Sequence, residues 1–224
     1  MTGTVESRPV TITEPDATWQ RRLGAPAVLL GLVVLAVGMF VVRDGEVPAW
    51  ERRTFRAVND LPDFLYRPLW PFQQLGNLVV GPIVAIIAAL LHRYRLAIAV
   101  LVITAAKLIG ERLVKAVSSR QRPGTSIGPD IAGRGDVSLT GESFVSGHAV
   151  LVAALACLIT PYVRGRWRAV PWVLLGMVMV TRVYVGAHNP LDVVCGAALG
   201  VAIGSVLNLV VGVPSTSEPD TSVR

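Results

Sequence analysis

Three short segments of this chain place cations, histidines and a carboxylate at the ends of apolar runs. The first begins at Lys115 and, after six residues, reaches Arg122-Pro123, with Arg120 between them. Two cations at the end of an apolar run suit a phosphate, and they equally suit the anchoring of a helix end among lipid headgroups. Lys is rare in this Arg-rich chain, so a compact ammonium at position 115 is unexpected.

The second segment is Ser146-Gly147-His148, where a polar stretch becomes apolar. Ser146 suits the N-cap position of a helix, and the free backbone N–H groups of the first turn then point outward. A helix N-terminus of this kind can bind phosphate, and His148 can donate or accept a proton. Taken alone, a polar cap at the membrane interface would explain the same three residues.

The third segment contains Arg182, His188 and Asp192, separated by five and three residues. Asn189 and Pro190 suit the N-cap and first position of the next helix, which puts Asp192 in its first turn. A carboxylate four residues after His188 can accept the proton of one imidazole nitrogen and leave the other free to attack. A charged helix boundary would account for the Arg and the Asp, but not for His188.

The overall composition is that of a membrane protein. Of the 224 residues, 52% are hydrophobic. The net charge of +6 comes from Arg clusters between apolar runs, where positive charge sets membrane topology, so we expect no nucleic-acid partner. The cysteines, Cys157 and Cys195, lie in apolar stretches as small core residues and indicate neither a disulfide framework nor a metal site.

Apolar runs of helical length recur along the chain. An α-helix needs about 20 residues to cross a hydrocarbon core of about 30 Å. The stretch 43–71 mixes charged and aromatic residues, which suits helices lying along the membrane interface. We therefore expect an all-α integral-membrane bundle, with an interfacial helical segment between spans 1 and 2. The six expected transmembrane helices are 23–42, 75–91, 96–117, 146–163, 169–184 and 189–213.

The charge distribution predicts the orientation of this bundle. The short connections 92–95 and 164–168 are strongly basic, and short basic loops stay in the cytoplasm. Both termini are then cytoplasmic, and the three reactive segments lie together at the outer face of a membrane that we expect to be a bacterial plasma membrane. The expected organisation is one six-span domain, 23–213, between two disordered tails, 1–22 and 214–224.

In order and spacing, the Lys-x6-Arg-Pro, Ser-Gly-His and Arg-x5-His-x3-Asp segments resemble the three-part signature of the type-2 phosphatidic acid phosphatase (PAP2) family. The resemblance runs from Lys115 to Asp192, and the six-span layout extends it over most of the chain. It implies a membrane enzyme that hydrolyses phosphorylated lipids without a metal or another cofactor.

The resemblance also implies a role for each residue of the three segments. His188 attacks phosphorus to give a phosphohistidine, and Asp192 orients His188. His148 first protonates the departing oxygen and then activates water. The implied phosphate-binding residues are Lys115, Arg122, Ser146, Gly147 and Arg182.

Two positions depart from the family pattern. Val145 stands where Pro normally precedes Ser-Gly-His, and Thr181 stands where Ser normally precedes Arg182. The absence of Pro removes a restraint on the turn into the helix, whereas Thr retains the hydroxyl. Reduced activity and a specialised substrate are both compatible with these changes.

Two neighbouring features are also open to interpretation. Lys107, Glu111 and Lys115 follow one another at four-residue intervals, which favours ion pairs along a helix. The loop 118–143 is rich in Gly and Ser, so it could be a flexible lid over the site or a disordered connection.

The expected function is hydrolysis of a phosphomonoester or diphosphate on a membrane lipid. Prenyl phosphate, prenyl diphosphate, phosphatidate and phosphatidylglycerophosphate all remain open as substrates, and so does the oligomeric state. The same site could transfer phosphate to another lipid, because a phosphohistidine reacts with alcohols as well as with water. A non-catalytic binder of phosphorylated lipids would need the same pocket. A transporter is disfavoured, because the ionisable residues gather at one membrane face.

Overall fold

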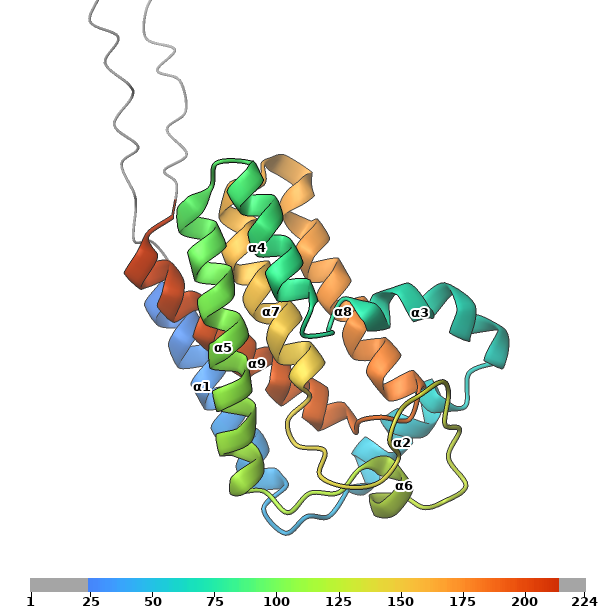
Figure 1. Cartoon of the computed structure of the whole chain (residues 1–224). Coiled ribbons are helices and arrows are strands. Elements are labelled where there is room, and N and C mark those ends of the chain that lie inside the picture. The colour runs from blue at the N-terminus through green and yellow to red at the C-terminus, as the bar shows by residue number, and fades with distance from the viewer. Residues whose placement is uncertain (1–23, 214–224) are drawn as a thin grey trace, which may run out of the picture.

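The computed structural model describes residues 24–213 of the chain (Figure 1). Within that range every regular element is a helix, and Gln121 and Glu142 form an isolated strand-like bridge. The all-α class predicted from the sequence is therefore confirmed. The expected tails, 1–22 and 214–224, lie outside the described residues.

Helices occupy each predicted apolar run and the stretch between the first two. The second predicted span is shorter than expected, because residues 75–79 form turns and bends before α4 begins. The elements are α1 (Gly24–Val41), α2 (Ala49–Asn59), η1 (Asp63–Leu65), α3 (Tyr66–Gln74), α4 (Val80–Leu90), α5 (Tyr94–Ala116), α6 (Pro123–Ser126), α7 (Gly147–Ile159), η2 (Thr160–Tyr162), η3 (Gly165–Ala169), α8 (Val170–Tyr184) and α9 (Pro190–Val211).

Helix length and composition bear on the number of membrane spans. Within the described part, two helices are long and apolar enough to cross a membrane: α1, with 18 residues, and α9, with 22. α4, with 11 residues, is about 16 Å long, and α7 with η2 is likewise apolar but short. α5 has 23 residues but carries charges in its second half. The count of six spans stays a prediction.

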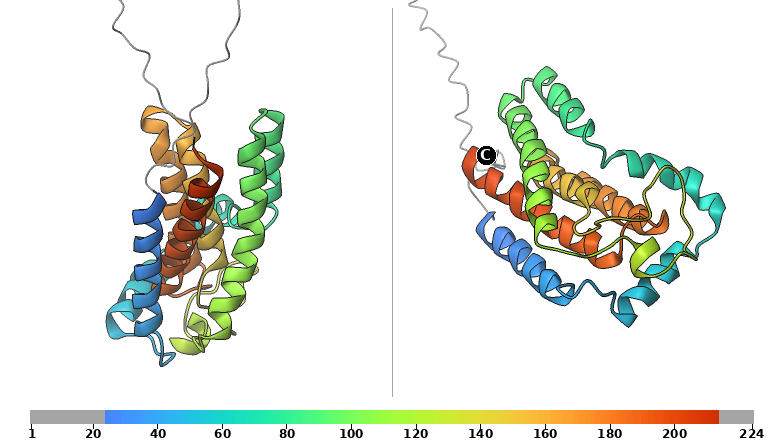
Figure 2. Two further views of the ribbon diagram at one scale, coloured as in Figure 1. Left: turned by 90° about the vertical axis from the view of Figure 1, so that its left-hand side faces the viewer. Right: turned by 60° about the horizontal axis from the view of Figure 1, so that its bottom comes forward.

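Helix α9 lies between α1 and α7, as Figures 1 and 2 show. Gly196, Gly200 and Gly204 recur at four-residue intervals on the face of α9 that packs on α7. A Cβ at Gly200 would lie 2.2 Å from the carbonyl oxygen of Val150, so a larger residue does not fit here. Small residues at this spacing let two helices approach closely. The close packing brings the N-terminal ends of α7 and α9 together.

Helix α1 packs on α9 by the same means. Gly31 lies against the backbone of Ala198, and Gly38 lies against the side chain of Cys195. Cys195 is a free, buried cysteine within an apolar cluster, as predicted for a small core residue. Glycines therefore allow close packing on both sides of α9, against α7 and against α1.

The basic connections lie at one end of the bundle and the reactive segments toward the other. The turn between α4 and α5 and the η3 segment are at the top of Figure 1, near the described chain ends, whereas α6 and its surrounding loop are at the bottom. Gly24 packs on Leu209, so the first helix starts where the last one ends. This relative placement agrees with the one expected from the charges, and its assignment to the cytoplasm stays a prediction.

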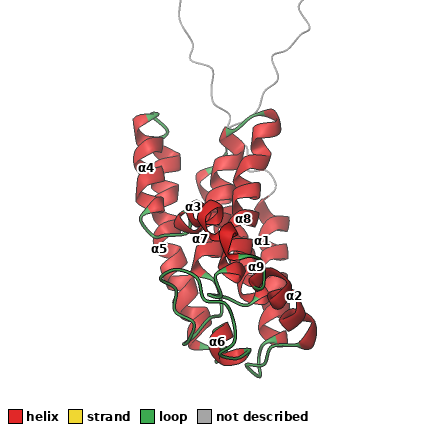
Figure 3. Cartoon of the chain, turned by 90° about the vertical axis from the view of Figure 1, so that its right-hand side faces the viewer, coloured by secondary structure: helices red, strands yellow, loops and turns green. Residues whose placement is uncertain are grey.

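Between α1 and α4, the chain runs outside the bundle as α2, η1 and α3 (Figure 3). The stretch is helical, as predicted. Glu51, Phe55 and Asn59 recur every four residues on one face of α2 and are completely buried. Asn59 Nδ2 donates to the carbonyl oxygens of Ala132 and Tyr184, at 2.8 and 2.9 Å. The inward face of α2 is therefore tied to the end of α8.

The loop 118–143 is anchored to the same two helices. Arg134 Nη1 donates to the carbonyl oxygens of Asn59 and Tyr184, at 2.8 and 2.7 Å. The guanidinium of Arg134 also lies 4.1 Å from the ring centroid of Tyr184. The loop is thus an ordered segment held against the helices that carry the reactive residues.

Candidate active site

The N-termini of α7 and α9 are hydrogen-bonded to each other. The N–H of Ser146, the N-cap of α7, donates to the carbonyl oxygen of Asp192 at 3.0 Å. Gly196, one turn further along α9, leaves room for the carbonyl of Ser146, which a Cβ would approach to 2.6 Å. Two of the three predicted segments, Ser146-Gly147-His148 and His188 to Asp192, are brought together by this contact.

Helix α8 ends shortly after Arg182 in a Schellman motif. Gly186 has a φ of +80°, its N–H donates to Val183, and the N–H of Ala187 donates to the carbonyl oxygen of Arg182. In this motif the chain reverses around a left-handed residue, usually glycine. The N–H of His188 reaches the same Arg182 carbonyl at 3.3 Å. The reversal therefore brings His188 back to the helical turn that carries Arg182.

His188 and Asp192 face each other across the start of α9. Nδ1 of His188 is 3.6 Å from Oδ2 of Asp192, and both side chains are buried. The same Oδ2 accepts the backbone N–H of Asn189 at 2.8 Å, which holds this oxygen at the start of α9. Because the carboxylate addresses Nδ1, Nε2 is the nitrogen left for bond formation.

The surroundings of His188 disfavour the charged form of its imidazole. Burial lowers the pKa of its imidazole well below the usual value of 6.5. The positive charges of Arg182, Arg122 and Lys115 lower that pKa further, and Glu111 opposes them. A neutral imidazole keeps the lone pair that a nucleophile needs.

Arg122 and Arg182 bring two guanidinium groups to the site. Nη1 of Arg122 donates to the carbonyl oxygen of Ala187, directly before His188, at 2.9 Å. Burial lowers the pKa of Arg122, although a guanidinium stays charged at neutral pH. Arg182 is only 6% exposed, and its Nε makes no hydrogen bond to a described residue. Two such cations together suit a bound anion.

Lys115 is held by an ion pair within α5. Its Nζ is 2.7 Å from Oε1 of Glu111, and Nζ of Lys107 is 2.8 Å from Oε2. The ion pairs predicted from the four-residue spacing are therefore confirmed. The carboxylate of Glu111 also lies against Gly147, where a Cβ would be 2.2 Å from Oε2. Glu111 thus places an anion at the N-terminus of α7, which is the predicted phosphate position.

The remaining donors are uncharged. Gly147 is the first residue of α7, so its backbone N–H has no partner within the helix. The hydroxyl of Ser146 is buried and makes no hydrogen bond to a described residue. His148 follows in the first turn, against the α3–α4 turn. Among residues 24–213, no group of three or more His, Cys, Asp or Glu side chains could hold a metal ion.

Glu51 and Arg120 also lie at this site, although neither was among the predicted site residues. Both are completely buried, Arg120 Nη2 is 2.6 Å from Glu51, and Arg120 Nε is 3.1 Å from Oδ1 of Asp192. Arg120 has a sequence signal, because it lies between Lys115 and Arg122. Glu51 has none in its neighbourhood, since its partner Arg120 is 69 residues away along the chain.

A family model described as the PAP2 superfamily matches residues 95–213, which is more than half of the 224 residues. The chain belongs to the PAP2 superfamily. The matched range contains all three reactive segments and the helices α5, α7, α8 and α9 that position them. Glu51 and the α3–α4 turn that contacts His148 lie outside this range.

This PAP2 chain is 35% identical over 100 residues to the decaprenylphosphoryl-5-phosphoribose phosphatase of Mycobacterium tuberculosis, in two strains. The match covers 45% of this chain and 52% of the relative, so the chain spans about half the length of the curated relatives it matches.

Two solved structures share the fold. LpxE from Aquifex aeolicus superposes with a TM-score of 0.62 at 22% identity, covering 72% of this chain and 96% of LpxE. A transmembrane PAP2-type phosphatidylglycerolphosphate phosphatase from Bacillus subtilis superposes with a TM-score of 0.61 at 17% identity, covering 83% and 94%. At these identities, the likeness concerns the helical architecture.

The structure accommodates both departures from the PAP2 signature. Val145 is completely buried in an apolar cluster with Phe144 and Val150. The hydroxyl of Thr181 donates to the carbonyl oxygen of Met177 at 2.7 Å, so it stabilises its own helix. The hydroxyl retained at position 181 is thus not free to bind phosphate.

Proposed function

We propose that this PAP2 protein hydrolyses a phosphate or diphosphate ester on a membrane lipid through a phosphohistidine at His188. The observation that carries the proposal is a buried imidazole whose Nδ1 lies 3.6 Å from the Asp192 carboxylate. Arg122, Arg182 and Lys115 surround that imidazole closely enough to depress its pKa. A nucleophile, its orienting carboxylate and cations for a phosphate are thereby combined.

In the first step, Nε2 of His188 forms a bond to phosphorus while the bond from phosphorus to the leaving oxygen breaks. His148 donates a proton to that oxygen, and Asp192 stabilises the positive charge that the imidazole gains. In the second step, His148 accepts a proton from water, whose oxygen attacks phosphorus and releases Nε2. Inorganic phosphate leaves, and His188 is neutral again.

The other residues of the site hold the phosphate oxygens and stabilise the charge that develops on them. Backbone N–H groups at the N-terminus of α7 contribute with the side chains. No metal or other cofactor is assigned a step. The proposed phosphate-binding residues are Lys115, Arg122, Ser146, Gly147 and Arg182.

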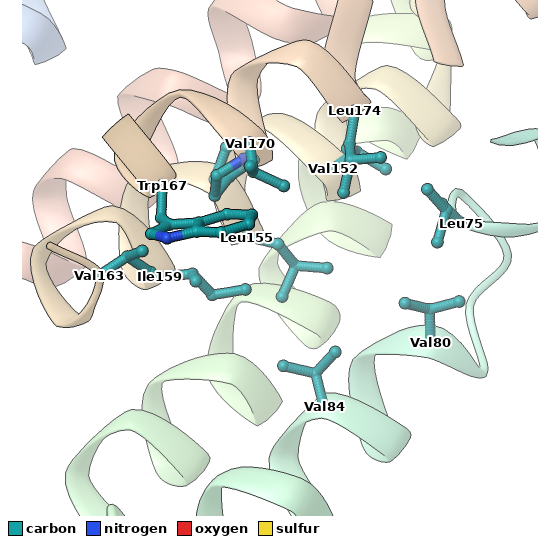
Figure 4. A pocket seen from close by; sticks show the side chains of 12 residues that line it. Leu75, Val80, Val84, Val152, Leu155, Ile159, Val163, Trp167, Val170 and Leu174 are labelled. Carbon is teal, nitrogen blue, oxygen red and sulfur yellow. The ribbon is translucent and has the colours of Figure 1, made fainter. Parts of the chain in front are cut away.

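An apolar groove beside the site supports a lipid as the substrate. It encloses about 430 Å³ between α4, α7 and α8, with Val84 and Leu155 on facing walls (Figure 4). Val152 and Leu155 follow His148 by four and seven residues, so they lie on the same face of α7. An apolar chain in the groove would therefore have its phosphate at the His148 end.

The membrane arrangement belongs to the same proposal. Six helices, α1, α4, α5, α7, α8 and α9, cross the bilayer as the domain 23–213, and the α2–η1–α3 segment lies at the interface. The site faces the outside, and the chain ends face the cytoplasm. The lengths of α1 and α9 and the position of the basic connections at the end opposite the site support this topology.

Names of related proteins suggest which lipids to test. The 35% identical relative is named for a decaprenyl-linked substrate, and the Bacillus subtilis structure is named for phosphatidylglycerolphosphate. We therefore place prenyl phosphates first in a panel that also contains prenyl diphosphates, phosphatidate and phosphatidylglycerophosphate.

The test is phosphate release from this panel by the purified protein in detergent, with a chelator present. We expect release by the wild type, none by His188→Ala, and an acid-labile phosphoenzyme that accumulates in His148→Ala. Full activity of His188→Ala would overturn the mechanism. Transfer of labelled phosphate to an added lipid alcohol would identify a phosphotransferase, and binding without turnover of any lipid would identify a non-catalytic binder.

A further inference from the structure

Three charged side chains from distant parts of the chain form a buried row that ends at His188. Nη2 of Arg120 is 2.6 Å from Oε2 of Glu51, and its Nε is 3.1 Å from Oδ1 of Asp192. None of the three side chains has exposed surface. Asp192 then presents its other oxygen, Oδ2, to His188 at 3.6 Å. The charges along the row alternate up to the imidazole.

Glu51 is joined to α9 as well as to Arg120. Its Oε1 accepts the backbone N–H of Leu191 at 2.7 Å, one residue before Asp192. Burial raises the pKa of the Glu51 carboxyl, and the charge of Arg120 and the Leu191 N–H oppose that rise. Helix α2 is thereby connected through Glu51 to the helix turn that orients His188.

Joining two helices through buried ions has a large desolvation free energy, because the charged groups are removed from water. Apolar residues of similar volume often do so at least as well, whereas removal of one ion leaves an uncompensated charge. The sum of the charges here has a consequence for His188. Glu51, Arg120 and Asp192 together carry one net negative charge. If Arg120 paired with Asp192 alone, the sum would be zero, and Asp192 would attract the Nδ1 proton less strongly.

We propose that Glu51 and Arg120 are positioning residues for His188, with Arg120 fixing the direction of the Asp192 carboxylate and Glu51 balancing the charge of Arg120. Asp192 then keeps its full effect on the positive charge that His188 gains as it attacks phosphorus. The inference rests on the proposed role of His188 as nucleophile. It makes α2 part of the catalytic arrangement.

The test varies the charges of Glu51 and Arg120 while the other charged groups around His188 stay in place. Those groups lie on α5, α7, α8 and α9 and on the segment after α5. They are Asp192 of α9, Arg182 of α8, His148 of α7, Lys115 and Glu111 of α5, and Arg122 of the segment after α5.

Three variants, Glu51→Gln, Arg120→Gln and the double variant, change the net charge of the row from −1 to 0, to −2 and back to −1. A lost negative charge should lower the pKa of His188, and a lost positive charge should raise it. Each shift should be on the order of one pH unit. The double variant should titrate like the wild type. The acid limb of the pH profile of kcat/KM should move to lower pH in Glu51→Gln and to higher pH in Arg120→Gln.

The pKa of His188 can be read without activity. The chain has 3 histidines, so NMR of histidine-labelled protein in detergent gives few signals, and His188→Ala identifies the one to follow. Opposite shifts in the single variants support the proposal. Shifts in one direction, or none, in folded variants would overturn it. Failure of the wild type to release phosphate would refute the proposed function, and the pKa of His188 could still be measured by NMR.

If the single variants do not fold, the double variant decides, because it keeps the wild-type net charge of −1 in the row. The expected result is a His188 pKa like that of the wild type, with kcat/KM reduced about tenfold, since the Asp192 carboxylate has lost its fixed direction. A wild-type rate in the folded double variant would show that Glu51 and Arg120 do not position Asp192.

Discussion

Gly76 lies directly against the imidazole of His148. A Cβ at position 76 would be 2.2 Å from Cδ2 and 2.4 Å from Cγ of that ring, closer than side-chain atoms can approach. The turn between α3 and α4 therefore determines where His148 sits. We predict that Gly76→Ala displaces the ring and lowers kcat for a lipid phosphate about 10- to 100-fold, because displacement by about 1 Å can have that effect.

The matched control for this prediction is Gly176→Ala in α8. A Cβ at position 176 meets nothing within 4 Å, and Ala favours a helix over Gly. This variant should keep the wild-type rate, and thermal unfolding of both variants checks that they are folded. A wild-type rate in Gly76→Ala would mean that the turn does not hold His148.

Glu111 faces both Lys115 and the N-terminus of α7, so its carboxylate would repel a phosphate bound at the proposed site and would compete with it for Lys115. We predict that Glu111→Gln tightens inhibition by inorganic phosphate about tenfold. The measurement is the inhibition constant at fixed pH. Glu46→Gln, at an exposed position, should leave it unchanged. Weaker inhibition in Glu111→Gln would instead show that Glu111 mainly holds Lys115 in position.

The part of the site that could be predicted from the sequence is the part with local patterns. Ser146 before Gly147 marks a helix start, and Asn189-Pro190 marks another, so the elements that carry His148 and Asp192 follow from neighbouring residues. Glu51 could not be found in this way. Its hydrogen-bond partners are 69 and 140 residues away, and only the tertiary structure brings them together.

The same limit applies to the fold. Apolar runs predict where helices form, but the run that starts at residue 75 opens with turns and bends, where Gly76 meets His148. The polar loop 118–143 has no periodic pattern, and its order comes from contacts such as those of Arg134 with the carbonyl groups of Asn59 and Tyr184. Such contacts form between residues that are distant along the chain, so they cannot be predicted from the amino-acid composition of the loop.

Val84 and Leu155 face each other across the apolar groove (Figure 4). We predict that Val84→Trp lowers hydrolysis of a long-chain prenyl phosphate at least about tenfold and leaves a short-chain, water-soluble phosphate ester unaffected. A lipid chain gains little free energy on moving from the bilayer to another apolar surface. The loss should therefore appear in kcat, as a misplaced phosphate, more than in KM.

Ile86→Trp is the control for the groove. Ile86 is also on α4, but it is 60% exposed and does not line the groove. This variant should hydrolyse both substrates at the wild-type rate. An equal loss of both substrates in Val84→Trp would mean that the substitution disturbs the site itself, and no loss of either would show that the lipid chain lies elsewhere.

The lowered pKa of His188 makes the stability of the fold depend on pH. Burial and the neighbouring cations hold the folded-state pKa of His188 well below 6.5, whereas the unfolded chain titrates at about 6.5. As the pH falls below about 6.5, the unfolded state binds a proton that the folded state does not, so the free energy of unfolding decreases. Above that pH, the contribution is constant.

We therefore predict that the Tm of the wild type in detergent falls as the pH is lowered from about 6.5 to about 5, and that His188→Gln makes this fall smaller. Thermal unfolding across that pH range provides the measurement. His92→Gln, at an exposed histidine, should leave the slope as it is in the wild type. If His188→Gln shows the same slope as the wild type, the surroundings do not hold His188 neutral, and the nucleophile proposed here would have to lose a proton before it could attack phosphorus.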